Sequence, residues 1–136
     1  MAFDRLRGDK IYKTVILDSS AFLMFFEFSI DWEKELFRLL DGYCIVVPTE
    51  VIKELEVLSK QTASERKRKA AASLKLAERY ETIETLAGNA DDAVIEAAKK
   101  MHGVVVTNDT ELRKRLNQDS IPVIFLRGKK KLALEE

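Results

Sequence analysis

Lys13-Thr-Val-Ile-Leu-Asp-Ser-Ser-Ala-Phe22 joins a short apolar run directly to a carboxylate and two hydroxyls. The unbroken run of Val15, Ile16 and Leu17 predicts a strand that is buried on both faces, as in a parallel sheet. Parallel sheets bind their ligands at the carboxyl ends of the strands, and Asp18 follows this strand directly. Asp18 is therefore a candidate functional residue, although Asp is also a preferred N-cap for the helix expected after it.

The composition indicates one soluble globular domain. The chain has 136 residues, of which 46% are hydrophobic and 34% are charged, and its formal net charge is zero. That length suffices for one domain with a substantial core. The N-terminal segment lacks a signal-peptide pattern, and no apolar run approaches the roughly 20 residues that span a bilayer. We therefore expect a cytoplasmic protein without a membrane partner.

Several functional classes are disfavoured by what the sequence lacks. The single cysteine, Cys44, excludes an internal disulfide and a cysteine-based zinc cluster. No glycine-rich dinucleotide fingerprint or P-loop occurs, and one histidine with one cysteine gives little support for a catalytic triad. A phosphatase that uses Asp18 as its nucleophile would need a second Asp at position 20, which is Ser20.

Apolar strands alternate with helical patterns along the chain. After the first strand, we expect strands at 44–47, 82–86, 104–106 and 121–126. Between them, helices are predicted near 21–28, 30–40, 49–58, 64–80, 93–102 and 112–116. This alternation predicts an α/β fold, a three-layer α/β/α sandwich with a central parallel sheet of about five strands. We expect one domain over residues 1–136, with its core at about 13–126 and a short basic C-terminal tail.

Acidic residues follow every predicted strand of the central sheet except the last. Because the carboxyl ends of parallel strands share one edge, these side chains are expected to share one pocket. The candidates are Asp18, then Glu50, Glu54 and Glu56, then Asp91 and Asp92, and finally Asp109. Helix capping is an alternative for Asp92 and Asp109, but Glu54 lies too far into its helix to cap it. The helical spacing does not choose between Glu54 and Glu56.

Carboxylates gathered in one pocket repel one another unless a cation neutralises them. Hard oxygen donors without histidine favour Mg²⁺ or Mn²⁺ over zinc. Such ions activate water for in-line attack on a phosphodiester and stabilise the leaving oxygen. The pattern therefore predicts a hydrolytic metal site that acts on phosphodiesters.

Four motifs in this sequence resemble the PIN-domain nuclease family and occur in the family's order. They are Val15-Ile-Leu-Asp-Ser-Ser-Ala21, Val47-Pro-Thr-Glu-Val-Ile-Lys-Glu-Leu55, Ala90-Asp-Asp-Ala-Val-Ile-Glu-Ala-Ala98 and Val105-Val-Thr-Asn-Asp109. Together they cover the chain from about Lys13 to Leu126. The doubled aspartate followed by Val-Val-Thr-Asn-Asp is most similar to the ribosomal-RNA-processing branch of archaea and eukaryotes. The toxin branch of toxin–antitoxin pairs is similar in length and in its acidic residues.

The resemblance implies a metal-dependent endoribonuclease that cleaves single-stranded RNA, with Mg²⁺ or Mn²⁺ as cofactor. Its implied catalytic and metal-binding quartet is Asp18, Glu54, Asp92 and Asp109, and Asp91 is an additional metal ligand. The resemblance also favours Glu54 over Glu56. It implies that Thr107, Asn108 and Ser19 position water or support the carboxylates. A catalytically silent RNA-binding or scaffold module is the alternative, because some family members resemble one.

Three basic clusters are either solvated surface or contacts to RNA phosphates that flank the acidic pocket. They are Arg66, Lys67, Arg68 and Lys69; Arg113, Lys114 and Arg115; and Lys129, Lys130 and Lys131. The apolar run at 22–28 further suggests a homodimer, which is common in the family.

Overall fold

The computed structural model describes residues 5–7, 10–61 and 65–136. Its strands are β1 (Arg5–Arg7), β2 (Lys10–Leu17), β3 (Tyr43–Pro48), β4 (Glu81–Ile83), β5 (Val104–Val106), β6 (Val123–Arg127) and β7 (Lys131–Glu135). Its helices are α1 (Ser19–Glu27), α2 (Trp32–Leu40), α3 (Thr49–Ser59), α4 (Glu65–Ala77), α5 (Ala90–Met101) and α6 (Thr110–Gln118). Ser64, at the start of the helix predicted near 64–80, lies outside the described residues.

The sheet is parallel at its centre, as the sequence predicts. Over the described residues the strand order is β4-β3-β2-β5-β6-β7, and the pairs β4–β3, β3–β2, β2–β5 and β5–β6 are all parallel. Val15, Ile16 and Leu17 of β2 are 0% exposed because β3 and β5 flank this strand and helices cover it. The parallel sheet of about five strands is therefore confirmed, with β2 at its centre.

Two antiparallel strands extend the sheet beyond the prediction. β1 pairs with β2, and β7 pairs with β6 in a hairpin that matches Phe125 to Ala133. The segment expected as a basic tail is instead the turn of this hairpin followed by a strand. Gly128, in the turn, has φ +73°, a backbone conformation that glycine adopts more readily than other residues. Leu132 is buried while Lys131 is exposed, which is the alternation of an edge strand.

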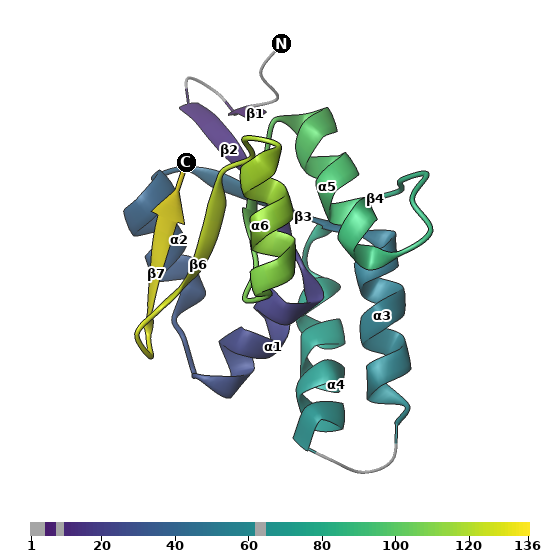
Figure 1. The fold of residues 1–136 in the computed structure, drawn as a ribbon. Helices are drawn as coiled ribbons and strands as arrows, with labels where there is room; N and C mark the ends of the chain where they lie inside the picture. The colour runs from purple at the N-terminus through teal and green to yellow at the C-terminus, as the bar shows by residue number, and fades with distance from the viewer. Residues whose placement is uncertain (1–4, 8–9, 62–64) are drawn as a thin grey trace.

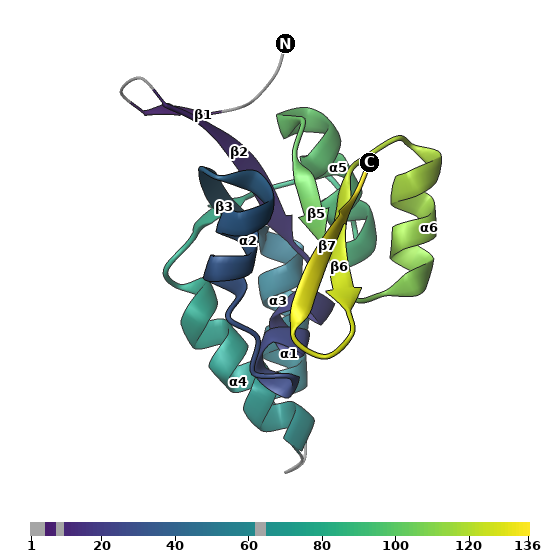
Figure 2. The same ribbon diagram turned by 90° about the vertical axis from the view of Figure 1, so that its left-hand side faces the viewer.

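Helices cover both faces of the sheet (Figures 1 and 2). α2 packs against β3 and β7, α5 against β2 and β3, and α6 against β6. In Figure 2, α2 and α6 lie on opposite sides of the strands, which gives the expected three layers. α3 and α4 pack against each other and extend beyond the sheet edge at which β2 ends (Figure 1). No helix within the described residues is long and apolar enough to cross a membrane.

The apolar run of α1 packs inside a single copy of the chain. Phe22, Met24 and Phe25 are at most 1% exposed. The Phe25 ring stacks on Trp32 of α2 with 5.0 Å between the ring centroids. These contacts account for the run by core packing, so the homodimer stays a prediction without this support.

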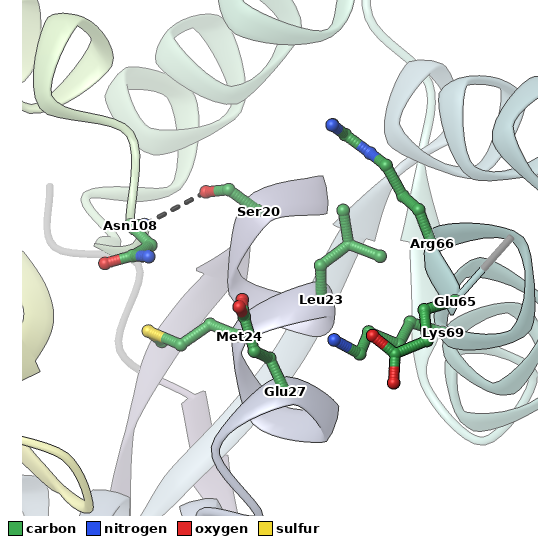
Figure 3. Close-up of a pocket in the computed structure, with 8 residues that line it drawn as sticks. All are labelled: Ser20, Leu23, Met24, Glu27, Glu65, Arg66, Lys69 and Asn108. Atoms are coloured by element: carbon green, nitrogen blue, oxygen red, sulfur yellow. Dashed lines mark hydrogen bonds between the residues drawn. The ribbon is translucent and has the colours of Figure 1, made fainter.

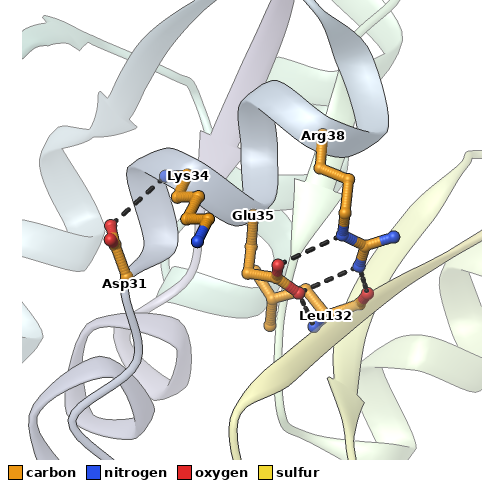
Figure 4. Close-up of polar contacts among 5 residues, drawn as sticks. All are labelled: Asp31, Lys34, Glu35, Arg38 and Leu132. Atoms are coloured by element: carbon orange, nitrogen blue, oxygen red, sulfur yellow. Dashed lines mark hydrogen bonds and ion pairs between the residues drawn. The ribbon is translucent and has the colours of Figure 1, made fainter.

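A buried carboxylate fastens the C-terminal hairpin to the body of the domain (Figure 4). Glu35 of α2 accepts a hydrogen bond from the backbone N–H of Leu132 at 2.8 Å and two more from Arg38, at 2.9 and 3.1 Å. The Arg38 guanidinium also donates to the Leu132 carbonyl at 2.7 Å. The side chains of α2 thus satisfy both backbone groups of Leu132, the residue that buries its side chain at the start of β7.

Glu35 is expected to make the stability of the fold dependent on acidic pH. The hydrogen bonds from Arg38, and then that from Leu132, lower the pKa of Glu35 to about 2, below its ordinary value of 4.5. Because the folded pKa is the lower one, the stabilisation is fully present above about pH 4.5 and is lost as the pH falls toward 2. Urea unfolding should show Glu35→Gln to be roughly 1–3 kcal/mol less stable than wild type at pH 7.

The matched control for Glu35→Gln is Glu33→Gln, which removes an exposed carboxylate from the first turn of the same helix. It should change stability by no more than about 0.5 kcal/mol. The destabilisation by Glu35→Gln should shrink as the pH is lowered. A difference from wild type that stays constant from pH 7 to pH 2.5 would contradict the role given to the Glu35 carboxylate.

Candidate active site

A pocket of about 360 Å³ lies at the carboxyl ends of the central strands. Nine side chains from four helices and two strand ends line it: Asp18, Ser19, Ser20, Leu23, Glu54, Leu58, Arg66, Asp91 and Asp109. Four of these are carboxylates, and Arg66 is the one cation among the lining residues. We call this the acidic pocket. The carboxylates that follow parallel strands were expected to share one pocket, and these four do.

Asp18 is the most rigidly held of the four carboxylates. The residue is 2% exposed, and its Oδ2 accepts hydrogen bonds from Ser20 Oγ at 2.6 Å and from Thr107 Oγ1 at 2.9 Å. It occupies the N-cap position of α1, but its side chain makes no capping hydrogen bond. Its backbone carbonyl accepts the first bonds of the helix, from Ala21 N at 3.0 Å and Phe22 N at 3.4 Å. The capping alternative thus applies to the backbone of Asp18 and leaves its carboxylate to the pocket.

Burial raises the pKa of Asp18 above its usual value, and the neighbouring Glu54 carboxylate raises it further. Hydrogen bonds from Ser20 and Thr107 act in the opposite direction. The net effect is a carboxyl group whose negative charge is poorly solvated at this position. A nearby cation would relieve that cost.

Ser20, which was not among the predicted site residues, links the two strand ends that meet at Asp18. Its Oγ contacts Thr107 Oγ1 at 3.1 Å and accepts a hydrogen bond from Asn108 N at 2.9 Å. Thr107, which is 1% exposed, in turn accepts from Asp109 N at 3.0 Å. A hydroxyl two residues after a strand-end aspartate was the available signal, because such side chains bond locally to nearby polar groups.

Glu54 reaches the acidic pocket from α3, where Ser19 Oγ donates a hydrogen bond to its Oε1. The other glutamates of α3 lie elsewhere. Glu50 accepts from Thr49 at 3.0 Å and from Thr85 at 3.2 Å, and Glu56 lines a separate groove that includes Tyr80. The structure therefore brings Glu54 to Asp18 and does not bring Glu50 or Glu56.

Asp91 lines the acidic pocket, whereas Asp92 does not. Asn89 is the N-cap of α5 and accepts from the Asp92 backbone N–H at 2.9 Å, while its own amide donates to Asp92 Oδ2 at 2.9 Å. Arg115 of α6 donates to the other oxygen, Oδ1, at 2.6 Å. This reciprocal pattern resembles a capping box, in which the third helical residue turns back toward the cap. Contrary to expectation, Asp92 faces its own helix terminus and Asp91 takes the place in the pocket.

The two neighbouring aspartates also differ in their electrostatics. Hydrogen bonds from Arg115 and Asn89 lower the pKa of Asp92. Partial burial, followed by the negative charges of Asp18 and Asp109, raises the pKa of Asp91. Neighbouring carboxylates therefore disfavour the negative charge of Asp91, whereas Arg115 and Asn89 favour that of Asp92.

Asp109 both caps a helix and lines the pocket. Its Oδ1 accepts from the backbone N–H groups of Glu111 at 2.9 Å and of Leu112 at 3.2 Å at the start of α6. Both capping bonds use the same oxygen. The capping alternative raised for Asp109 is therefore correct and is compatible with its place in the acidic pocket.

The lining residues match a divalent cation in donor type. Carboxylate and hydroxyl oxygens are the ligands that Mg²⁺ and Mn²⁺ prefer. Over the described residues, no three Asp, Glu, His or Cys side chains stand close enough together, as placed, to hold one ion. The match to a divalent cation therefore rests on four carboxylates that line one pocket, where neighbouring carboxylates raise the pKa of Asp18 and of Asp91. Their side chains would have to move closer together to coordinate an ion.

Only one of the three basic clusters adjoins the acidic pocket. Arg66 of α4 lines it, and Lys69 lines a neighbouring pocket. Arg113 is instead paired with Glu135 at 2.9 Å and lies 3.6 Å from the centre of the Phe125 ring. Arg115 is held by Asp92, and Lys114 lies 3.5 Å from Glu111.

The remaining basic residues line neither pocket. Lys129 and Lys130 lie in the turn of the β6–β7 hairpin, and Lys131 begins β7. Arg68 is exposed and Lys67 is half-buried on α4. The structure therefore brings Arg66 and Lys69 toward the site, and it does not bring the α6 and hairpin clusters there.

The chain is similar to curated archaeal proteins over nearly its whole length. It is 34% identical to "Ribonuclease VapC4" of Methanocaldococcus jannaschii over 88% of this chain and 94% of that protein. It is 30% identical to "Ribonuclease VapC9" of Archaeoglobus fulgidus over 99% of this chain and 98% of that protein.

Among solved structures, the PIN domain endonuclease Utp24 superposes with a TM-score of 0.74 and 23% identity, over 90% of both chains. A domain of a functionally unknown protein from M. jannaschii superposes with a TM-score of 0.63 and 19% identity, over 91% of this chain and 95% of that one. These likenesses show the fold. The family model described as "PIN like domain" matches residues 15–129, from the strand that carries Asp18 to the β6–β7 turn, so the chain belongs to the PIN-like domain family.

Proposed function

We propose that this protein is a metal-dependent endoribonuclease that cleaves single-stranded RNA. The observation that carries the proposal is the convergence of Asp18, Glu54, Asp91 and Asp109 on one pocket, with Asp18 buried at its base. Relatives that are named ribonucleases, at 34% and 30% identity over almost the full chain, support the choice of RNA as substrate.

Each carboxylate has a distinct structural role in this proposal. Asp18 is the central ligand, because Ser20 and Thr107 fix its orientation from two strand ends. Ser19 orients Glu54 by its hydrogen bond, and Asp109 offers the oxygen that does not cap α6. Asp91 completes the set from the first turn of α5. A bound Mg²⁺ or Mn²⁺ would lower the pKa of an attacking water and stabilise the leaving oxygen of the phosphodiester.

Arg66 supplies the positive charge that an acidic site needs in order to admit a polyanion. Arg66 lines the acidic pocket and forms no ion pair with another described residue. Phosphate contacts by such side chains provide most of the affinity for nucleic acid. We therefore propose that RNA approaches across α4, and not across α6, where Arg113 and Arg115 are already paired.

The cellular setting has two candidates. One is the processing of ribosomal RNA precursors, and the other is a ribonuclease toxin of a toxin–antitoxin pair. The toxin setting is at least as well supported, because the curated relatives carry VapC names at 30% identity or more. The likeness to Utp24, at 23% identity, supports the fold alone.

Metal removal is expected to abolish cleavage and leave the protein folded. A single-stranded RNA labelled with a fluorophore and a quencher should be cleaved with Mg²⁺ or Mn²⁺, cleavage should stop with excess EDTA, and added Mn²⁺ should restore it. Circular dichroism should be unchanged by EDTA, because hydrogen bonds within the protein already hold Asp18. RNA binding without cleavage in any divalent metal would indicate the silent RNA-binding module instead. Cleavage that persists in EDTA would contradict the proposal.

A further inference from the structure

A second pocket, of about 390 Å³, adjoins the acidic pocket between α1 and α4 (Figure 3). The two pockets share three lining residues, Ser20, Leu23 and Arg66, so they form one continuous depression. Binding sites for small ligands have volumes of roughly 300–1,000 Å³. We call it the α1–α4 pocket.

The cations of the α1–α4 pocket are available to a ligand. Arg66 and Lys69 are three residues apart on α4, which places them on the same face of the helix. Figure 3 shows both side chains extending from α4 toward the side of α1 that carries Leu23. Within the described residues, neither forms an ion pair, in contrast to Arg113 and Arg115 of α6. Unpaired cations beside a carboxylate site suit an anion that bridges the two pockets.

The rest of the wall consists of two carboxylates, Glu27 and Glu65, an apolar surface and the amide of Asn108. Leu23 and Met24 project from α1 into the pocket. Asn108 lies opposite α4, and its backbone N–H donates to Ser20 Oγ at 2.9 Å, which fixes its position. Its side-chain amide has no hydrogen bond among the described residues and therefore offers one donor group and one acceptor. An apolar face, an amide and flanking cations are the groups that recognise an unpaired nucleotide.

We infer that the α1–α4 pocket binds the nucleotide adjacent to the phosphodiester that lies in the acidic pocket. Arg66 contacts the phosphate between the two pockets, Lys69 contacts the other phosphate of that nucleotide, and Asn108 contacts the edge of its base against Leu23. This inference rests on the proposed ribonuclease function. It assigns Asn108 to substrate selection, where the family resemblance suggested water positioning or support of the carboxylates.

The decisive measurements separate phosphate contacts from base contacts and from cleavage. Binding of labelled single-stranded RNA is measured by fluorescence anisotropy in the Asp18→Asn background, so that it does not depend on catalysis. There, Arg66→Gln and Lys69→Gln should each weaken binding about 10-fold for every sequence and lower the dependence of log affinity on log salt by about 0.7. Lys75→Gln, which removes an exposed charge from the last turn of the same helix, should change affinity less than twofold.

For Asn108, the readout is sequence preference in the otherwise wild-type enzyme. With a pool of RNA randomised around the cut, Asn108→Ala should flatten the base preference at one position next to the cut and raise KM, with kcat within about threefold. A loss confined to kcat, with the preference unchanged, would overturn the assignment of Asn108 and return it to water positioning.

The same experiments distinguish failure of the pocket from failure of the enzyme. Equal RNA affinities for Arg66→Gln and Lys75→Gln, together with metal-dependent cleavage by wild type, would overturn the α1–α4 pocket and leave the ribonuclease intact. Weaker binding by Arg66→Gln, with no cleavage by wild type in any metal, would retain the pocket and overturn the enzyme.

Discussion

Substitution of Asp18 by Asn is expected to reduce RNA cleavage by about 10²–10³-fold while the fold remains intact. The expected loss is large because Asp18 is 2% exposed at the base of the acidic pocket and is held by Ser20 and Thr107. Asn has nearly the same shape and keeps one oxygen to accept those bonds, but it removes the negative charge. Single-turnover cleavage with saturating Mn²⁺ measures the effect. Cleavage equal to that of wild type would show that this carboxylate takes no part in the reaction.

The same substitution is expected to make the protein more stable in the absence of metal. Burial raises the folded pKa of Asp18 above its ordinary value, so the wild-type protein loses stability as the pH rises through that range. Asn does not ionise, and its advantage should therefore be present at pH 7 and disappear at acidic pH. The expected gain is seen as a higher melting temperature of Asp18→Asn at pH 7. A destabilised variant would indicate that lost hydrogen bonds outweigh the relief of the buried charge.

Activity and stability are thus expected to change in opposite directions on substitution of Asp18, a result that would separate a functional carboxylate from a structural one. Glu35 provides the contrast within the same chain. It is also buried, but Arg38 and Leu132 compensate its charge and lower its pKa. Removal of the Glu35 charge should destabilise the fold, whereas removal of the Asp18 charge should stabilise it. Strain from uncompensated charge is typical of functional sites.

The central fold was predictable because its signals are local. Continuous apolar runs such as Val104–Val106 predict buried parallel strands wherever they occur, and the structure confirms those at the centre of the sheet. The hairpin strand β7 was missed because the turn before it is rich in lysine and resembles a solvated tail. Its burial depends on Glu35 and Arg38, which lie 97 and 94 residues earlier in the chain and bind Leu132. The periodicity of the local sequence cannot predict a contact between residues so far apart in the chain.

The site was predictable at the level of strand ends and not at the level of individual charges. The rule that ligands bind at one sheet edge brings Asp18 and Asp109 together without any knowledge of side chains. Which basic cluster is available to bind RNA depends on ion pairs between distant parts of the chain. Glu135 of β7 pairs with Arg113, and Asp92 of α5 pairs with Arg115. Those partners are 22 and 23 residues away in sequence, so a charge count along the chain could not identify them.

The two neighbouring aspartates of α5 are expected to respond very differently to substitution. Asp91→Asn should reduce metal-dependent cleavage by about 10²-fold or more, because Asp91 lines the acidic pocket and its charge is opposed by Asp18 and Asp109. Asp92→Asn should leave cleavage within about threefold, because Asp92 is occupied by Asn89 and Arg115 outside the pocket. The pair is well matched, since both changes are isosteric and one residue apart in the same helical turn.

Stability provides the complementary readout for this pair. Asp92→Asn removes the charge that pairs with Arg115 and is expected to change stability only slightly, since that pair is exposed to solvent. Asp91→Asn should leave stability unchanged or raise it slightly, because it relieves repulsion among carboxylates. Measurements at several Mn²⁺ concentrations add a further test: Asp91→Asn should require more Mn²⁺ for half-maximal cleavage, and Asp92→Asn should not. If instead Asp92→Asn abolishes cleavage and Asp91→Asn does not, α5 must turn on metal binding to exchange the two residues. The Asp92–Arg115 ion pair would then have to break before the site assembles.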